Sequence, residues 1–309
     1  KFRLPFWATS QHASSQHACG ACAAMSFSCA SDALAVLESP AAPAPAPYTL
    51  ALGMGVRDPS ARHALEMLRR HQATWMPRTW LGHLLMYQCG RSAPAWLANV
   101  SSHCVSTWPE RLIHNYRLGA ELLRLLYERM PHYRFYAKID LDTIVYPEAL
   151  ALYLQAHAAD ELHYFGSIES THRQRRVPRA HCANFGYCQP FDYAQGGFEG
   201  LSHKALRAVV TGGCFDRIGA VPCGDDKLCV WHAEDAALGV CAAMLGFQLT
   251  TCACFFPWGP CSVYNTSSCA RRLCERPLSI HKVKKADWFD RWWPLGRGVS
   301  GVFSLSRGG

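Results

Sequence analysis

The sequence predicts an α/β layered domain built on a largely parallel β-sheet. Apolar segments rich in β-branched and aromatic residues alternate along the chain with segments whose apolar residues recur at helical spacing. A second observation is a pair of acids, Asp140 and Asp142, placed at the end of one strand-like segment. Ligands of open α/β sheets bind beyond the carboxyl ends of the strands, so these acids fall where a functional site is expected.

The N-terminal residues 1–46 are expected to form a stem or linker. They show little periodicity and run into an alternating Ala-Pro stretch at 39–47, a composition typical of an extended, semi-rigid spacer. Cys19 and Cys22 could form half of a zinc site, but no second Cys-x-x-Cys pair follows at finger spacing, which favours a disulfide or a loose stem. The globular domain is expected to span residues 47–309.

The first half of this domain is expected to contain one strand and two helices. The apolar run 48–56 predicts the strand, and Ser60 is the expected N-cap of a helix over 61–72. A longer helix is predicted over 112–130, with one apolar face. That face comprises Leu118, Leu122, Leu125 and Leu126.

The run that begins at Tyr133 is predicted to be the strand that delivers Asp140 and Asp142, before a helix over 147–158 and a strand over 163–168. Residues i and i+2 of a strand point to the same side, so the two carboxylates should lie together. They repel each other unless a cation lies between them or one is protonated. Mg²⁺ and Mn²⁺ prefer such oxygen ligands, which predicts a metal–diphosphate site. Acids at a strand-to-helix junction also serve as helix caps or turn formers.

The composition is that of an ordinary globular protein, with 309 residues, 50% hydrophobic and 17% charged. No run approaches the roughly 18 apolar residues of a membrane helix. The sequence starts at Lys1, so an N-terminal anchor or signal could precede it. Part of the net charge of +8 comes from the runs 171–179 and 281–285. These are expected to be solvated loops or sites for anionic substrates, because no aromatic-interleaved basic stripe indicates nucleic acid.

Cysteine usage favours an oxidising compartment. The chain has 16 cysteines, and an odd number of them lies from Cys89 onward, so the globular part cannot pair all of its own. Asn99 and Asn265 each begin an N-glycosylation sequon. These features together are compatible with a secretory lumen.

Five segments resemble, in the same order, motifs of glycosyltransferase family 31, the Fringe and core 1 β1,3-galactosyltransferase group. They are Ala73-Thr-Trp75 with Arg78 after it, Lys138-Ile-Asp-Leu-Asp-Thr-Ile-Val145, Tyr193-Ala-Gln-Gly-Gly197 with Leu201-Ser202, Glu234-Asp-Ala-Ala-Leu-Gly-Val-Cys241, and Pro277-Leu-Ser-Ile-His281. The resemblance spans about residues 48–285. The chain departs from the family pattern in four places: Leu141 replaces the middle acid of a triple-Asp block, Gln195 replaces a serine, one residue fewer precedes Leu201, and residues 117–121 replace Asn-Leu-Thr-x-Lys.

This resemblance implies a GT-A (Rossmann-like) fold with a mixed, largely parallel sheet flanked by helices. It implies an inverting hexosyltransferase that uses Mn²⁺, with Mg²⁺ as the alternative, and a UDP-sugar donor carrying galactose, N-acetylhexosamine or another hexose. A β1,3 linkage, a glycan or glycoprotein acceptor and the Golgi lumen are also implied, with membrane attachment only through an N-terminal anchor.

The resemblance also implies roles for individual residues. Asp142 and His281 would bind the metal directly, and Asp140 would orient metal-bound water or the donor ribose. Asp235 would be the general base. Gly196, Gly197 and Glu234 would lie at the donor sugar. Without the resemblance, Glu234 and Asp235 are acids of a helix first turn, and His281 is a surface residue of a basic loop.

Other functions fit parts of the pattern. Asp140-Leu-Asp142 also resembles the nucleophile motif of haloacid-dehalogenase-type Mg²⁺ phosphatases, with 224–226 as a later acidic motif, but that motif usually follows the first strand of its domain. A GT-A-like domain that binds glycan or nucleotide-sugar without turnover is a second alternative. A disulfide-stapled lumenal scaffold is a third.

Overall fold

The computed structural model describes residues 47–78, 80–91, 95, 101–109, 115–167, 182, 186–195, 197–221, 233–251, 255–256 and 278–293. Several predictions made from the sequence lie outside these residues. They concern the stem 1–46, Asn99 and Asn265, the basic run 171–179, the acidic strip 224–226 and Gly196.

A mixed, largely parallel β-sheet of seven strands forms the centre of the described structure, in the order β3-β2-β1-β4-β7-β6-β8. Its strands are β1 (Leu50–Val56), β2 (Leu81–Gln88), β3 (Ser101–Val105), β4 (Phe135–Ile139), β6 (Tyr164–Gly166), β7 (Phe198–Ser202) and β8 (Leu249–Thr251). Only β7 runs antiparallel to its neighbours β4 and β6. A small second sheet has the order β5-β10-β9 and consists of β5 (Ile144–Val145), β10 (Ser279–Ile280) and β9 (Phe255–Phe256).

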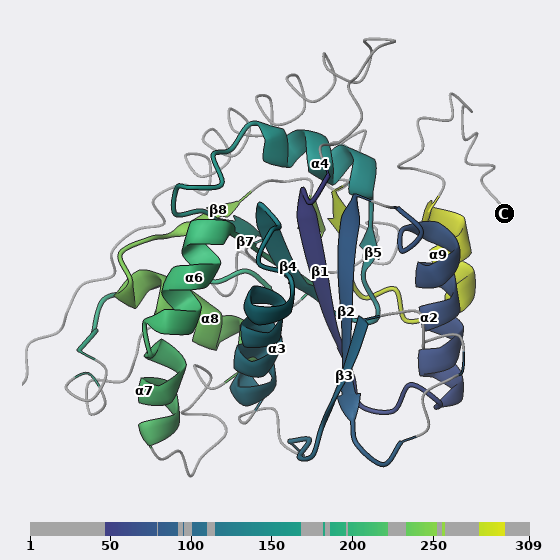
Figure 1. The fold of residues 1–309 in the computed structure, drawn as a ribbon, viewed down its shortest axis with the longest axis horizontal. Coiled ribbons are helices and arrows are strands. Elements are labelled where there is room, and N and C mark those ends of the chain that lie inside the picture. The colour runs from purple at the N-terminus through teal and green to yellow at the C-terminus, as the bar shows by residue number, and fades with distance from the viewer. Residues whose placement is uncertain are drawn as a thin grey trace, which may run out of the picture.

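Helices cover both faces of the main sheet (Figure 1). One face carries α2 (Arg62–Thr74) and α9 (Ala286–Trp292), while α4 (Pro147–Gln155) contributes to the same hydrophobic core. The other face carries α3 (Tyr116–Arg129), α6 (His203–Thr211), α7 (Cys214–Ala220) and α8 (Glu234–Met244). The predicted α/β class, with a mixed and largely parallel sheet flanked by helices, is therefore confirmed and is consistent with a GT-A type of domain.

Residues of β1 alternate between these two cores because successive side chains of a strand point to opposite faces. Leu50, Leu52 and Met54 belong to the core under α2, whereas Ala51 belongs to the core under α3. A β-carbon on Gly53 would come within 2.9 Å of Leu126, so this glycine lets α3 approach the strand closely.

The start of the first helix differs from the prediction. The residue before α2 is Ala61, which makes no side-chain cap. The Ser60 hydroxyl instead donates to Asp58 Oδ1 over 2.7 Å, so Ser60 stabilises the preceding turn. The helix begins one residue later than expected, so Ala61 holds the cap position, while the Ser60 N–H and hydroxyl both donate to Asp58 Oδ1. The third predicted helix ends at Gln155, earlier than expected.

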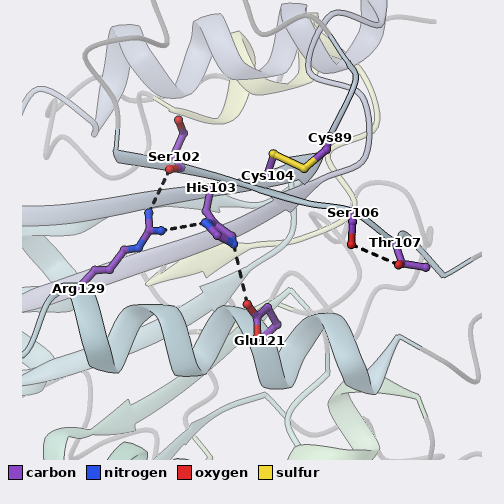
Figure 2. Close-up of a disulfide and its surroundings, with 8 residues drawn as sticks. All are labelled: Cys89, Ser102, His103, Cys104, Ser106, Thr107, Glu121 and Arg129. Atoms are coloured by element: carbon purple, nitrogen blue, oxygen red, sulfur yellow. Dashed lines mark hydrogen bonds and ion pairs between the residues drawn. A yellow bond between two sulfur atoms is a disulfide. The ribbon is translucent and has the colours of Figure 1, made fainter.

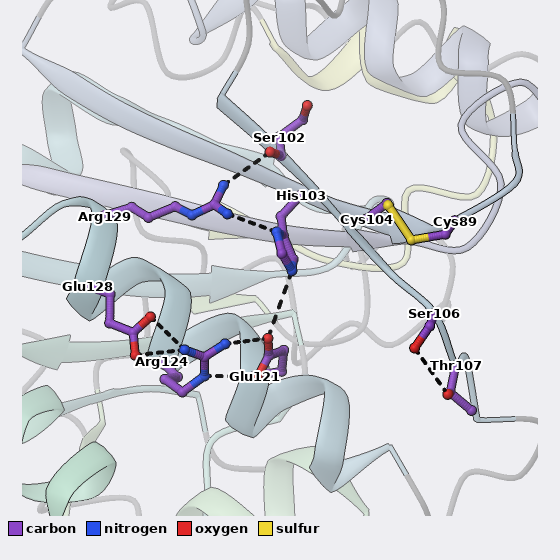
Figure 3. A network of polar contacts seen from close by, with 10 residues as sticks. All are labelled: Cys89, Ser102, His103, Cys104, Ser106, Thr107, Glu121, Arg124, Glu128 and Arg129. Atoms are coloured by element: carbon purple, nitrogen blue, oxygen red, sulfur yellow. Dashed lines mark hydrogen bonds and ion pairs between the residues drawn. A yellow bond between two sulfur atoms is a disulfide. The ribbon is translucent and has the colours of Figure 1, made fainter.

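The β3 edge of the main sheet is held by covalent and ionic links. The disulfide between Cys89 and Cys104 joins the end of β2 to β3 (Figure 2). His103 of β3 faces α3, where Arg129 contacts its Nδ1 atom over 2.8 Å and Glu121 faces its Nε2 atom (Figure 3). Two more disulfides join Cys182 to Cys188 and Cys214 to Cys241.

None of the helices in the described part of the chain has the length and apolar character that a membrane span requires.

Candidate metal centre

The sheet topology brings Asp140, Asp142 and His281 together although Asp140 and His281 are 141 positions apart in the sequence. The strand order turns at β1, because β2 and β3 lie on one side of it and β4 on the other. The aspartates follow β4, on the carboxyl side of this switch point. In the small sheet, Ile280 pairs antiparallel with Ile144, so His281 is held beside the turn that carries both aspartates.

The turn, and not the strand, places the two carboxylates. β4 ends at Ile139, and the Thr143 N–H donates to the Asp140 carbonyl over 3.1 Å to close a turn. The expected strand alternation is therefore not what aligns Asp140 with Asp142. The prediction that the two side chains converge is nevertheless confirmed, since both face one imidazole.

The three side chains have the geometry of a cation ligand set. His281 Nε2 lies 3.1 Å from Asp140 Oδ2 and 3.1 Å from Asp142 Oδ1, and one ligand atom from each residue fits within 4.8 Å of the others. Ligands at ~2.1 Å from an octahedral ion lie roughly 3 Å apart when they are neighbours. Carboxylate oxygens and an imidazole nitrogen together suit Mn²⁺.

One buried atom of the same group, Nδ1 of His281, lacks a hydrogen-bond partner among the described residues. Nε2 of His281 contacts both aspartates, and Oδ2 of Asp142 contacts the Lys284 ammonium. The carboxylate oxygens are thus balanced by side-chain cations, a place that a divalent ion can take. The residues present therefore fit a divalent metal ion, whose identity the geometry leaves open.

Charge around the triad follows from burial and from the neighbouring groups. Burial alone raises the pKa of Asp140, but Lys138 and His281 outweigh it, and the pKa falls to about 2. The pKa of Asp142 is also held well below its usual range, because His281 and Lys284 outweigh burial. Burial alone lowers the pKa of His281, whereas the two aspartates raise it above its ordinary value. Both carboxylates are therefore ionised at neutral pH.

His71 supports the aspartate turn from α2. Trp75 Nε1 donates to His71 Nδ1 over 2.8 Å, which leaves His71 Nε2–H to donate to the Leu141 carbonyl at 2.9 Å. Burial lowers the pKa of His71 to about 4, so the ring is neutral and this tautomer is maintained. Trp75 was singled out in the sequence through its motif, but His71 was not. Its only signal was a histidine one helical turn before that tryptophan.

Lys138 is the centre of a buried charge cluster behind the triad. Its ammonium lies 2.8 Å from Asp140 Oδ1, 3.2 Å from Glu234 Oε2 and 3.3 Å from Glu199 Oε1. Lys138 and Glu199 are paired residues of the antiparallel strands β4 and β7. Sequence reasoning gave neither of them a role. A charged residue inside each of two apolar strands was the signal that could have found them, since buried charges require partners.

The predicted general base Asp235 lies in the first turn of α8, next to Glu234. Its Oδ1 atom accepts a hydrogen bond from the Ala236 N–H over 2.8 Å. Burial raises the pKa of Asp235, while Lys138 lowers it and Asp140 raises it further. Its neighbour Glu234 contacts the Lys138 ammonium, which also contacts Asp140. The chain thus brings the acidic start of α8 to the same end of the sheet as the aspartate turn.

Gly197, a predicted donor-site residue, lies directly against His281. Gly196 falls outside the described residues.

The aspartate turn follows β4 and not the first strand, which is against the haloacid-dehalogenase alternative. A hollow of about 500 Å³ between α3 and α7, lined by Tyr116, Arg117 and Phe215 among others, does not include the triad.

The chain was compared with family models, curated proteins and solved structures. No family model matches the chain, and no curated protein matches it. The chain is similar to a solved structure described as a glycosyltransferase involved in the glycosylation of the major capsid of PBCV-1. The two are 8% identical, the match covers 80% of this chain and 99% of that chain, and the TM-score is 0.41.

Proposed function

We propose that the chain is an inverting, metal-dependent hexosyltransferase of the GT-A type, similar to glycosyltransferase family 31. The observation that supports it is the convergence of Asp140, Asp142 and His281 at the switch point of the sheet. Lys138 links this group to Glu234 at the acidic start of α8. The proposed donor is a UDP-hexose and the proposed acceptor a glycan or glycoprotein. The disulfides among the described residues support an oxidising compartment, for which we propose the Golgi lumen.

Asp142 and His281 would hold Mn²⁺ directly, and Asp140 would complete or orient the set. When bound, the ion would supply Lewis-acid neutralisation of the diphosphate leaving group. His281 has to be neutral to act as a ligand, so protonation of His281 would compete with metal binding. Lys138 would hold the Asp140 carboxylate in position, because its ammonium contacts Oδ1 while Oδ2 faces the His281 imidazole.

Asp235 would act as the general base. It would accept the proton of an acceptor hydroxyl while that oxygen bonds to the anomeric carbon and the sugar–diphosphate bond breaks on the opposite face, which inverts the configuration. A raised pKa makes an ionised carboxylate a stronger base than usual, and burial gives Asp235 this property. Glu234 is held by Lys138 and would contact the donor sugar.

The test is UDP release from a panel of UDP-sugars with Mn²⁺ and glycan acceptors, together with calorimetric binding of Mn²⁺ and UDP. We expect Asp142→Asn to lose Mn²⁺ binding and turnover together. Asp235→Asn should keep binding and lose about 10²–10⁴-fold in turnover. Asp287→Asn, an exposed acid of α9, is the matched control and should behave like the wild type.

Wild-type protein that binds neither Mn²⁺ nor any UDP-sugar would refute the proposal. Binding of both without turnover on any acceptor would instead identify the non-catalytic binding domain. Turnover that survives Asp235→Asn would assign the base to a different residue.

A further inference from the structure

Lys284 places a cation on one of the proposed metal ligands. Its ammonium contacts Asp142 Oδ2, while Oδ1 of the same carboxylate faces His281. The Lys284 side chain is 60% exposed, in contrast to the buried ammonium of Lys138. The sequence placed Lys284 in the basic run 281–285, expected to be a solvated loop or a site for anionic substrates, and the proposed mechanism assigns this lysine no role.

The backbone that carries Lys284 is fixed to the aspartate turn. The Val283 N–H donates to the Asp142 carbonyl over 2.9 Å, and the Val283 side chain is fully buried. Lys282 adopts a left-handed conformation with φ 63°, and its carbonyl accepts from the Lys284 N–H over 2.9 Å. The start of the lysine stem is therefore held beside the triad, and only the exposed side chain is free to change partner.

A divalent ion bound by the triad would repel this ammonium. Like charges a few ångström apart repel strongly at the low effective dielectric constant of a protein surface, and a divalent ion doubles the charge on one side. Water can solvate an exposed ammonium that leaves Asp142. The anchored backbone would still keep the lysine near the ion, where the phosphates of a nucleoside diphosphate arrive. Lysine binds phosphate as a mobile point charge.

We propose that Lys284 is an anion-binding residue of the donor site, which exchanges the Asp142 carboxylate for a donor phosphate when metal and nucleoside diphosphate bind. This inference rests on the proposed function. It makes Lys284 a competitor of the metal and a partner of the diphosphate, so its removal has opposite effects on the two ligands.

The experiment measures two affinities by titration calorimetry: Mn²⁺ alone, and UDP in saturating Mn²⁺. Lys284→Met should bind Mn²⁺ about 3- to 10-fold more tightly and UDP about 10-fold more weakly than the wild type. Lys284→Arg should recover most of the UDP affinity. The matched control is Lys285→Met, which removes the same charge from the next residue, whose ammonium lies over Trp288 at 5.7 Å, and should change both affinities less than twofold.

Two results would overturn the inference while the proposed function stands. One is a Lys284→Met protein with both affinities unchanged. The other is a protein with both affinities moved in the same direction, as a merely structural lysine would give. Wild-type protein that binds neither Mn²⁺ nor UDP would overturn the proposed function, and the role of Lys284 with it.

Discussion

Gly197 and His281 pack so closely that no side chain larger than hydrogen fits between them. A β-carbon on Gly197 would lie 2.4 Å from both Cβ and Cγ of His281 and 2.8 Å from its Nδ1 atom. Because the imidazole is enclosed by this glycine on one side and by the two aspartates on another, its position depends on residue 197. The glycine therefore has a positioning role toward the proposed metal ligand.

Gly197→Ala should consequently weaken metal binding. The added methyl group would push the imidazole away from Asp140 and Asp142, and we expect Mn²⁺ affinity to fall at least about 10-fold, with a loss of about 1–3 kcal/mol in unfolding free energy. Calorimetric Mn²⁺ titration checks the first effect. Gly55→Ala is the control, because its β-carbon would meet Trp108 at an ordinary 3.6 Å. Unchanged Mn²⁺ affinity in Gly197→Ala would contradict the positioning role.

Replacement of His71 should loosen the aspartate turn. His71→Leu leaves the Leu141 carbonyl and Trp75 Nε1 without their buried partner, and we expect the unfolding free energy to fall by about 2–4 kcal/mol. Urea denaturation measures this loss, and Mn²⁺ titration should show weaker binding as well. His63→Leu, an exposed histidine of the same helix, should have little effect on either quantity. Normal Mn²⁺ affinity in the His71 variant would mean that His71 stabilises the fold without supporting the metal site.

Removal of the Lys138 ammonium should destabilise the fold strongly. Lys138→Met leaves Glu199 buried with no opposite charge beside it, and breaking such a pair costs about 3–5 kcal/mol. The double variant Lys138→Met/Glu199→Met removes both charges and should recover a large part of this loss. Urea midpoints of the two variants give the comparison. A double variant no more stable than the single one would mean that packing, and not the uncompensated charge, causes the loss.

The stability of the metal-free protein should fall as the pH rises from about 4.5 to 7. Burial raises the pKa of Glu234 from its ordinary 4.5 to about 7, although Lys138 opposes the shift. Between these values the folded protein retains a proton that the unfolded chain has released, so folding is favoured at the acidic end. The free energy of unfolding should fall by at most about 1 kcal/mol per pH unit. The Glu234 side chain is 22% exposed, and solvent screening reduces the effect of its pKa shift.

Urea midpoints across this range, in the presence of a chelator, test the slope. Glu234→Gln should flatten it, because glutamine cannot titrate. The same slope in both proteins would assign the pH dependence to other groups, such as Glu199, whose pKa burial also raises.

The sequence alone determined the class of fold. Strand and helix periods are local properties, so the strands near residues 50 and 135 and the helices near 62, 116 and 147 were predictable within a few residues. Start points were less predictable, because capping depends on competing partners, and Ser60 bonded to Asp58 instead of the helix.

The sequence also indicated the aspartate pair, the late histidine and the acidic start of α8, since each falls in a motif. Tertiary structure decided how they meet. The pairing of β10 with β5 sets His281 beside Asp142, and the pairing of β4 with β7 sets Lys138 beside Glu199. Both pairings join residues more than 60 positions apart, and long-range contacts depend on strand order and register. Local sequence patterns specify neither, which is why the contacts of Lys138, Glu199, His71 and Lys284 emerged only from the folded chain.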